Sequence, residues 1–186
     1  MNKIILASKS PRRKQLLELA EIPFEIVAAG TDEHFPKNLP MEEIPVFIAK
    51  QKAIAVAKNQ PHKIVLAADT IVTIDNEVIG KPKDRNDAIR ILQKLSGRMH
   101  RVITGVSIVS EDKEEFFCDI TEVNFYPLSN KQIEFYIDEY QPYDKAGAYA
   151  IQEWIGAIGI EKINGDFYNV MGLPVSRVVQ ALQRFV

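Results

Sequence analysis

The chain has little cysteine, no long apolar run and no strong excess of either charge. Its 186 residues include a single cysteine, Cys118, so no internal disulfide can form and a reducing, cytoplasmic setting is expected. No apolar run approaches membrane-spanning length, and no long apolar leader precedes Pro11. The formal net charge of −2 argues against duplex nucleic acid as the main partner.

Several motifs of nucleotide and catalytic chemistry are also missing. The sequence holds neither a P-loop nor a Gly-x-Gly-x-x-Gly dinucleotide motif, and it has no serine-nucleophile elbow. Its three histidines, His34, His62 and His100, lack metal-ligand spacing. What remains is a scatter of carboxylates and cations, which suits phosphate chemistry with a hard divalent ion such as Mg²⁺ or Mn²⁺.

The hydrophobic pattern alternates between strand and helix. We predict strands at residues 3–7, 24–28, 63–68, 100–110 and 115–126, the last two as an antiparallel pair, and a hairpin turning at residues 75–76. Five helices are predicted. The first begins at Ser10-Pro11, the second spans 46–58, the third follows Asp84, the fourth follows a capping box at Ser129, and the last begins at Pro174. This order predicts a single domain, 1–186, of the α/β class with a mixed sheet.

The first predicted helix begins with an unusual concentration of positive charge. Ser10 is a suitable N-cap and Pro11 suits the first helical position. The cations near this end are Lys9, Arg12, Arg13 and Lys14. Because the helix dipole disfavours cations at an N-terminus, a bound anion is the better explanation, and free amides with guanidinium groups make a phosphate site.

Other polar residues lie at the ends of predicted elements. Asp69 directly follows a buried strand, where it either caps a turn or is paired or coordinated. Lys52, on a helix, could extend past apolar neighbours or point into a cleft. Lys81 follows Gly80 in a turn and could be a plain surface lysine or a phosphate ligand. Gln152 could read a base edge or bridge backbone groups.

A series of short motifs, taken in their order along the chain, resembles the Maf family of nucleoside triphosphate pyrophosphatases, also named septum formation inhibitors. The resemblance covers nearly the whole chain. The motifs that carry it are Ser8-Lys9-Ser10-Pro11-Arg12-Arg13, Asp32-Glu33, Lys52-Ala53, Ala68-Asp69-Thr70, Gly80-Lys81-Pro82, Thr104-Gly105-Val106, Asp144-Lys145-Ala146-Gly147-Ala148-Tyr149 and the segment 165–174.

The resemblance implies a fold, a reaction and a set of site residues. The fold would be a mixed twisted sheet in two lobes around a central cleft, like that of the inosine triphosphate pyrophosphatases. The reaction would release pyrophosphate from a nucleoside triphosphate with a divalent cation, Mg²⁺ or Mn²⁺, held by Asp69 and Glu33. Asp69 would also be the general base, and the other implied residues are catalytic Lys52 and Lys81 and substrate-binding Ser8, Arg12, Arg13, Thr70, Lys145 and Gln152.

Three of these positions, Arg12, Thr70 and Gln152, resemble the branch of the family that acts on dTTP and UTP. Modified pyrimidine triphosphates are a second possible substrate, and relatives are often homodimers. Two other functions stay open at this point. One is a nucleotide-binding regulator of cell division without required turnover. The other is a nucleotidyltransferase with an acceptor other than water.

Overall fold

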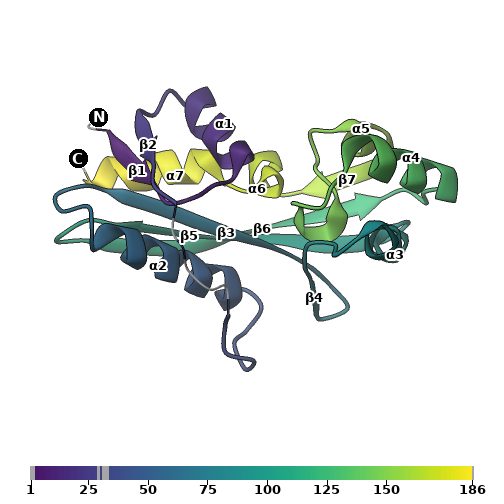
Figure 1. The fold of residues 1–186 in the computed structure, drawn as a ribbon, viewed down its shortest axis with the longest axis horizontal. Coiled ribbons are helices and arrows are strands. Elements are labelled where there is room, and N and C mark those ends of the chain that lie inside the picture. Colours follow the sequence, from purple (N-terminus) through teal and green to yellow (C-terminus); the bar gives the residue numbers. More distant parts are fainter. Residues whose placement is uncertain (1–2, 29, 31–33, 186) are drawn as a thin grey trace. The chain divides into compact units, whose positions relative to one another are not determined.

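The computed structural model describes residues 3–28, 30 and 34–185 (Figure 1). Within these residues, seven strands form one sheet. They are hydrogen-bonded in the order β2 (Phe24–Ile26), β1 (Ile4–Leu6), β3 (Val65–Ile74), β5 (Met99–Val109), β6 (Glu114–Phe125) and β7 (Ile160–Asn164), with β4 (Glu77–Ile79) paired to β3. Strand β1 pairs in parallel with both β2 and β3. The β3–β4 pair and the β6–β7 pair are antiparallel. The sheet is therefore mixed, as predicted.

The chain divides into two compact units. The first comprises Met1–Thr70, Thr104–Asp119 and Gly172–Val186, and the second comprises Ile71–Ile103 and Ile120–Met171. Three long strands contribute residues to both units: β3 (Val65–Ile74), β5 (Met99–Val109) and β6 (Glu114–Phe125). The predicted pair at 100–110 and 115–126 is confirmed, because β5 and β6 are sheet neighbours joined by the short turn at 110–113.

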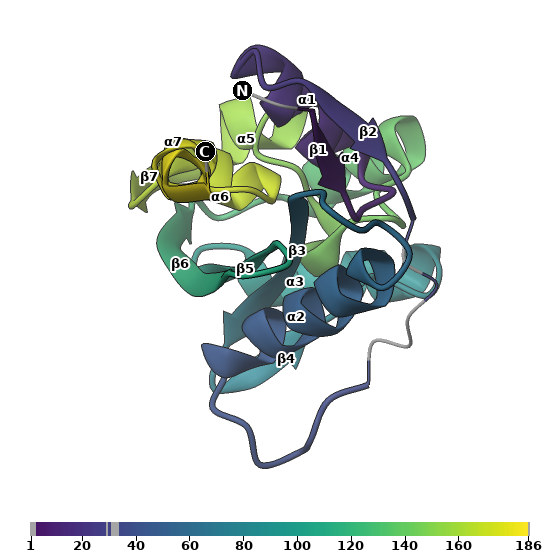
Figure 2. The same ribbon diagram turned by 90° about the vertical axis from the view of Figure 1, so that its left-hand side faces the viewer.

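The first unit places helices on both faces of its strands. Its own elements are β1 (Ile4–Leu6), α1 (Pro11–Leu19), β2 (Phe24–Ile26), α2 (Glu43–Ala57), α7 (Val175–Leu182) and the short 3₁₀ turn η2 (Gln183–Phe185). Helix α2 lies on one face, and α1 and α7 lie on the other (Figures 1 and 2). All five predicted elements in this list are confirmed, with α2 beginning three residues earlier than expected.

Small side chains let α2 approach the sheet closely. Ala53 and Val56 of α2 pack on Ile5, Val65 and Ala67 of β1 and β3 in one buried cluster. Further along, a Cβ added to Gly105 of β5 would lie 2.2 Å from the backbone of Pro45. Only glycine allows that approach, which gives the Thr104-Gly105-Val106 motif a packing role.

The second unit is built from short elements around the other ends of the long strands. These are β4 (Glu77–Ile79), α3 (Arg85–Leu95), α4 (Asn130–Tyr140), η1 (Ala146–Ala148), α5 (Trp154–Gly159), β7 (Ile160–Asn164) and α6 (Phe167–Met171). The β3–β4 hairpin turns at Asp75 and Asn76, which have φ of 53° and 59°, as a two-residue hairpin turn requires. Asp84 caps α3, and Ser129 forms the predicted capping box with Gln132.

Ion pairs and aromatic contacts join the elements of the second unit. Arg85 of α3 donates two hydrogen bonds to Asp138 of α4, at 2.7 and 2.9 Å. His100, Phe125 and Tyr149 form a cluster of edge-to-face rings with centroids 5.0–5.4 Å apart. Among the residues that the structure describes, no helix is long and apolar enough to cross a membrane.

Candidate functional site

The serine-rich turn after β1 is organised by hydrogen bonds within the first unit. The Ser8 hydroxyl accepts a hydrogen bond from the Ser10 backbone N–H at 3.1 Å. The Ser10 hydroxyl caps α1 by accepting from the backbone N–H of Arg13 at 3.5 Å, and Pro11 takes the first helical position. The predicted helix start is confirmed, and the turn carries Arg13 inward toward β3.

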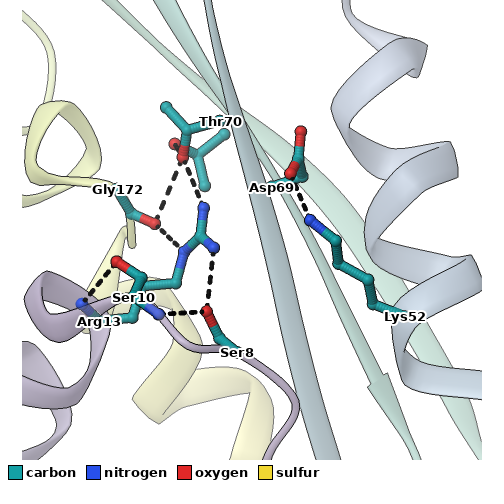
Figure 3. Close-up of polar contacts among 8 residues, drawn as sticks. Ser8, Ser10, Arg13, Lys52, Asp69, Thr70 and Gly172 are labelled. Carbon is teal, nitrogen blue, oxygen red and sulfur yellow. Dashed lines mark hydrogen bonds and ion pairs between the residues drawn. The ribbon is translucent and has the colours of Figure 1, made fainter. Parts of the chain in front are cut away.

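Arg13 is the centre of this side of the site. Its side chain is buried, with the residue only 9% exposed. The guanidinium donates from Nε to the carbonyl of Gly172 at 2.8 Å, from Nη1 to Ser8 Oγ at 3.2 Å, and from Nη2 to Thr70 Oγ1 at 3.0 Å (Figure 3). One side chain thus joins the turn after β1, strand β3 and the turn that precedes α7.

Thr70 and Gly172 complete this hydrogen-bonded group. Thr70 Oγ1 lies 3.0 Å from Thr104 Oγ1 and 3.4 Å from the Gly172 carbonyl oxygen, in addition to its contact with Arg13. Gly172 has φ of +116°, a backbone conformation that residues other than glycine rarely adopt. The turn before α7 therefore presents its carbonyl to two polar partners because glycine permits that backbone.

Asp69 lies on the opposite face of β3 from Thr70. Successive residues of a strand point to opposite faces, and Figure 3 shows the strand passing between the Arg13 group and Asp69. Lys52 of α2 reaches Asp69 with Nζ 2.7 Å from Oδ1. The two side chains are only 12% and 13% exposed. Lys52 therefore points at a carboxylate. Asp69 is paired, which is the second of the two alternatives that its position left open.

In the second unit, Lys145 is held between two carboxylates. Its ammonium lies 2.8 Å from Asp144 Oδ1 and 3.4 Å from Glu153 Oε1. The buried hydroxyl of Tyr136 donates to the other oxygen of Glu153 and accepts from the Ala150 backbone N–H at 3.2 Å. The network fixes the chain on both sides of residues 151–152.

Gln152 is exposed and lines a wide-open surface hollow of about 570 Å³ in the second unit. Apolar residues of the same hollow include Ile151, Ile163 and Phe167. An amide beside apolar and aromatic surface can accept a planar heterocycle and pair with its polar edge. The geometry is therefore compatible with the base-reading role that the resemblance implies for Gln152.

Next to this network, the motif that contains Lys145 ends in a buried aromatic contact. The Tyr149 hydroxyl and His100 Nε2 are joined by a hydrogen bond of 2.8 Å. Burial lowers the pKa of His100 to about 4, because the charged imidazolium would lose its hydration. Burial likewise raises the pKa of the Tyr149 phenol. Both groups are neutral at pH 7 and hold this part of the motif.

Three predicted site residues remain: Arg12 and Lys81, which the structure describes, and Glu33, which it does not. Arg12 is half-buried at the start of α1, and Lys81 is exposed after β4 in the second unit. Glu33 falls outside the described residues, so its metal-binding role stays a prediction. The structure brings together Ser8, Arg13 and Thr70, and separately Lys52 and Asp69.

Sequence reasoning missed four residues that the structure adds: Thr104, Gly172, Tyr136 and Glu153. Thr104 and Gly172 belong to two of the motifs that carry the resemblance, but neither motif indicated a role for these two residues. The sequence predicts only that a helix begins at Pro174, and Pro174 is the N-cap of α7. The carbonyl of Gly172 has two partners, Arg13 of α1 and Thr70 of β3, and sequence alone does not show that the fold brings these elements beside it.

A divalent ion is compatible with these groups. The described residues contain no cluster of three or more metal-ligating side chains. Mg²⁺, however, commonly uses one or two carboxylates with water and substrate phosphates as its other ligands. Asp69, an oxygen ligand in a nearly buried position, fits that donor set.

The fold and these groups define an α/β protein with a carboxylate–ammonium pair and a cation-rich helix start suited to a phosphorylated ligand. The Maf-like protein family matches the chain over residues 3–185. The chain belongs to this family.

Relatives of known name agree with the family assignment. A dTTP/UTP pyrophosphatase of Bacillus velezensis is 52% identical over 183 residues, covering 98% of this chain and 96% of that protein. A dTTP/UTP pyrophosphatase of Cytophaga hutchinsonii is 53% identical over 181 residues, covering 97% and 83%. A HAM1 protein from Coxiella burnetii shares the fold, with a TM-score of 0.54 at 16% identity over 99% and 100% of the two chains.

Proposed function

We propose that this protein hydrolyses dTTP and UTP to the nucleoside monophosphate and pyrophosphate. The observation that carries the proposal is the nearly buried Asp69–Lys52 pair at 2.7 Å, a positioned carboxylate in a chain about half identical to named dTTP/UTP pyrophosphatases. A nucleotide-binding regulator has no need of such a carboxylate. A cytoplasmic location belongs to the same proposal.

In the proposed reaction, Asp69 is the general base. Lys52 holds Oδ1, and we assign Oδ2 to the attacking water. Asp69 takes a proton as the water oxygen bonds to the α-phosphorus, and the bond from that phosphorus to the bridging oxygen breaks. Pyrophosphate leaves with the bridging oxygen. Holding the base in one orientation removes part of the entropic cost of the attack.

A divalent cation, Mg²⁺ or Mn²⁺, belongs to the same proposal. Asp69 would hold it together with phosphate oxygens, and Glu33 is the second ligand that the resemblance implies. The ion would supply Lewis-acid polarisation of the phosphate groups. Arg12 and Lys81 are the cations assigned to the charge that develops on the leaving pyrophosphate, a term that is commonly large.

Base selection is assigned to Gln152 together with Arg12, whereas the hydroxyl of Thr70 is engaged with Arg13, Thr104 and the Gly172 carbonyl. The Gln152 amide carries both a donor and an acceptor, as the imide edge of uracil or thymine requires. Thymine differs from uracil by one methyl group, worth only about 1–3 kcal/mol in a pocket. We therefore expect modest selectivity between dTTP and UTP and stronger rejection of purines.

The proposal is tested by a pyrophosphate-release assay with dTTP, UTP, CTP, GTP and ATP, each with Mg²⁺ or Mn²⁺. Release from dTTP and UTP well above the purine triphosphates supports it. No release from any triphosphate would favour the regulator of cell division. Turnover that requires an added acceptor would identify a nucleotidyltransferase.

A further inference from the structure

Arg13 stands out because all three nitrogens of its guanidinium donate hydrogen bonds inside the protein. A buried guanidinium must be hydrogen-bonded, and each of the three nitrogens of Arg13 donates to a group of the first unit. The three acceptors are uncharged: a backbone carbonyl and two hydroxyls. They come from residues 5, 57 and 159 positions away in the sequence. Such a pattern ties distant segments together.

The hydroxyl of Thr70 has its full set of hydrogen-bond contacts. A threonine hydroxyl offers one donor and two acceptor lone pairs. Thr70 Oγ1 makes three contacts, with Arg13 Nη2 at 3.0 Å, Thr104 Oγ1 at 3.0 Å and the Gly172 carbonyl at 3.4 Å. The hydroxyl therefore serves to attach β3 to Arg13, and only the methyl group of Thr70 is left for other contacts.

This attachment point is adjacent to the proposed base. Thr70 and Asp69 are consecutive in β3 and face opposite sides of the strand (Figure 3). Arg13 fixes the strand from the Thr70 side, while Lys52 fixes the Asp69 carboxylate from the other side. The backbone that carries Asp69 is thus held at two neighbouring residues, by a cation on each face.

We infer that Arg13 is a positioning residue, which sets the orientation of Asp69 through Thr70 rather than binding the triphosphate. The inference rests on the proposed function, because it assigns Arg13 a task in that same reaction. It differs from the expectation from sequence, where Arg13 is a phosphate ligand. A phosphate ligand acts on substrate binding, whereas a positioning residue acts on turnover.

A double-mutant cycle separates these two roles. Arg13→Lys keeps the charge but loses the planar fork that reaches three acceptors, and Thr70→Val keeps the shape but loses the hydroxyl. Each single variant is expected to lower kcat for dTTP by roughly 10–100-fold, since misplacement by about 1 Å can cost 10²-fold. KM and pyrophosphate inhibition are expected to change by less than about threefold. The double variant should be no worse than the poorer single variant, because both remove one coupling.

Two controls make the cycle specific. Thr70→Ser retains the hydroxyl and is expected to keep kcat within about threefold of wild type, which rescues what Thr70→Val loses. Glu18→Gln removes an exposed charge from the same helix, where Glu18 pairs with Lys14 at 3.6 Å, and should leave both constants unchanged. An Arg13→Lys variant that mainly raises KM, or effects that multiply in the double variant, would overturn the inference.

The cycle is also measured on unfolding by urea, which does not depend on catalysis. Coupled effects of Arg13→Lys and Thr70→Val on the free energy of unfolding are expected, and additive effects would overturn the positioning role. A wild-type protein that releases no pyrophosphate from any triphosphate would instead refute the proposed function. The two failures are therefore distinguishable.

Discussion

The ammonium of Lys52 lies 2.7 Å from Oδ1 of Asp69, and both side chains are nearly buried. The pair joins the middle of α2 to β3, so the helix that covers one face of the sheet also holds the proposed base. A buried ion pair is weak evidence for stability by itself, because desolvation offsets much of the attraction. A role in orienting the Asp69 carboxylate is the better explanation for an ion pair at this point of the strand.

Replacement of Lys52 tests that explanation. Lys52→Met should lower kcat for dTTP by roughly 10²–10³, as loss of a preorganised charged donor typically does. It should also cost about 3–5 kcal/mol of unfolding free energy, because the charge of Asp69 is left without its partner. Lys52→Arg is the matched control and should retain more of both. Steady-state kinetics and urea unfolding measure the two effects, and a Lys52→Met variant with wild-type kcat would contradict the role.

Gln152 should control which base is accepted. Gln152→Ala removes both polar groups from the hollow and is expected to reduce the preference for dTTP over GTP by about tenfold, the value of one hydrogen bond. Gln152→Glu keeps the size but loses the amide donor, and it should reduce the preference as well. The ratio of kcat/KM values for the two substrates is the measurement. An unchanged ratio in both variants would remove Gln152 from base selection.

Acid should destabilise the protein through His100. Its pKa is about 4 when folded and 6.5 as an ordinary value, so the unfolded chain binds a proton that the folded chain rejects. Stability from this group is therefore complete above about pH 6.5 and declines as the pH falls toward 4. The decline from pH 7 to 5 is about 2 kcal/mol. Urea unfolding of His100→Gln, which does not titrate, should show a smaller decline than wild type; equal declines would contradict the assignment.

The Tyr136 hydroxyl should matter for the stability of the second unit. Tyr136→Phe removes the hydrogen-bond partner of Glu153 Oε2 and of the Ala150 backbone N–H, at a cost of about 1–3 kcal/mol. Tyr140 stacks on Tyr136 but is 38% exposed, so Tyr140→Phe is the control and should change stability little. Equal losses in the two variants, measured by urea unfolding, would show that the network does not stabilise the unit.

The longer elements could be predicted from sequence because local signals agreed there. The N-caps Ser10, Asp84 and Ser129 and the hairpin turn at 75–76 all lie where the pattern placed them. The elements that were not predicted are α5, β7 and α6, which have five or six residues each. Such short elements depend on packing more than on propensity.

The site was predicted as a set of residues but not as an arrangement. Motif order identified Asp69, Lys52, Arg13 and Thr70. Asp69 was expected directly after a strand at 63–68, and this was wrong, because β3 continues to Ile74 and Asp69 lies within it. No local signal could show that Arg13 is buried against Gly172, 159 residues further along the chain. The same holds for Lys145. Its ion pair with Glu153 depends on the turn of the chain through η1, which no local signal predicted.

Asp69→Asn with dTTP is the most direct test of the proposed catalysis. The substitution keeps the size of the side chain, so thermal unfolding should show a cooperative transition like that of the wild type. With saturating Mg²⁺, we expect pyrophosphate release from dTTP by the wild type and a loss of at least about 10³-fold in the variant, because the general base is removed. An Asp69→Asn protein with turnover close to wild type would contradict the account.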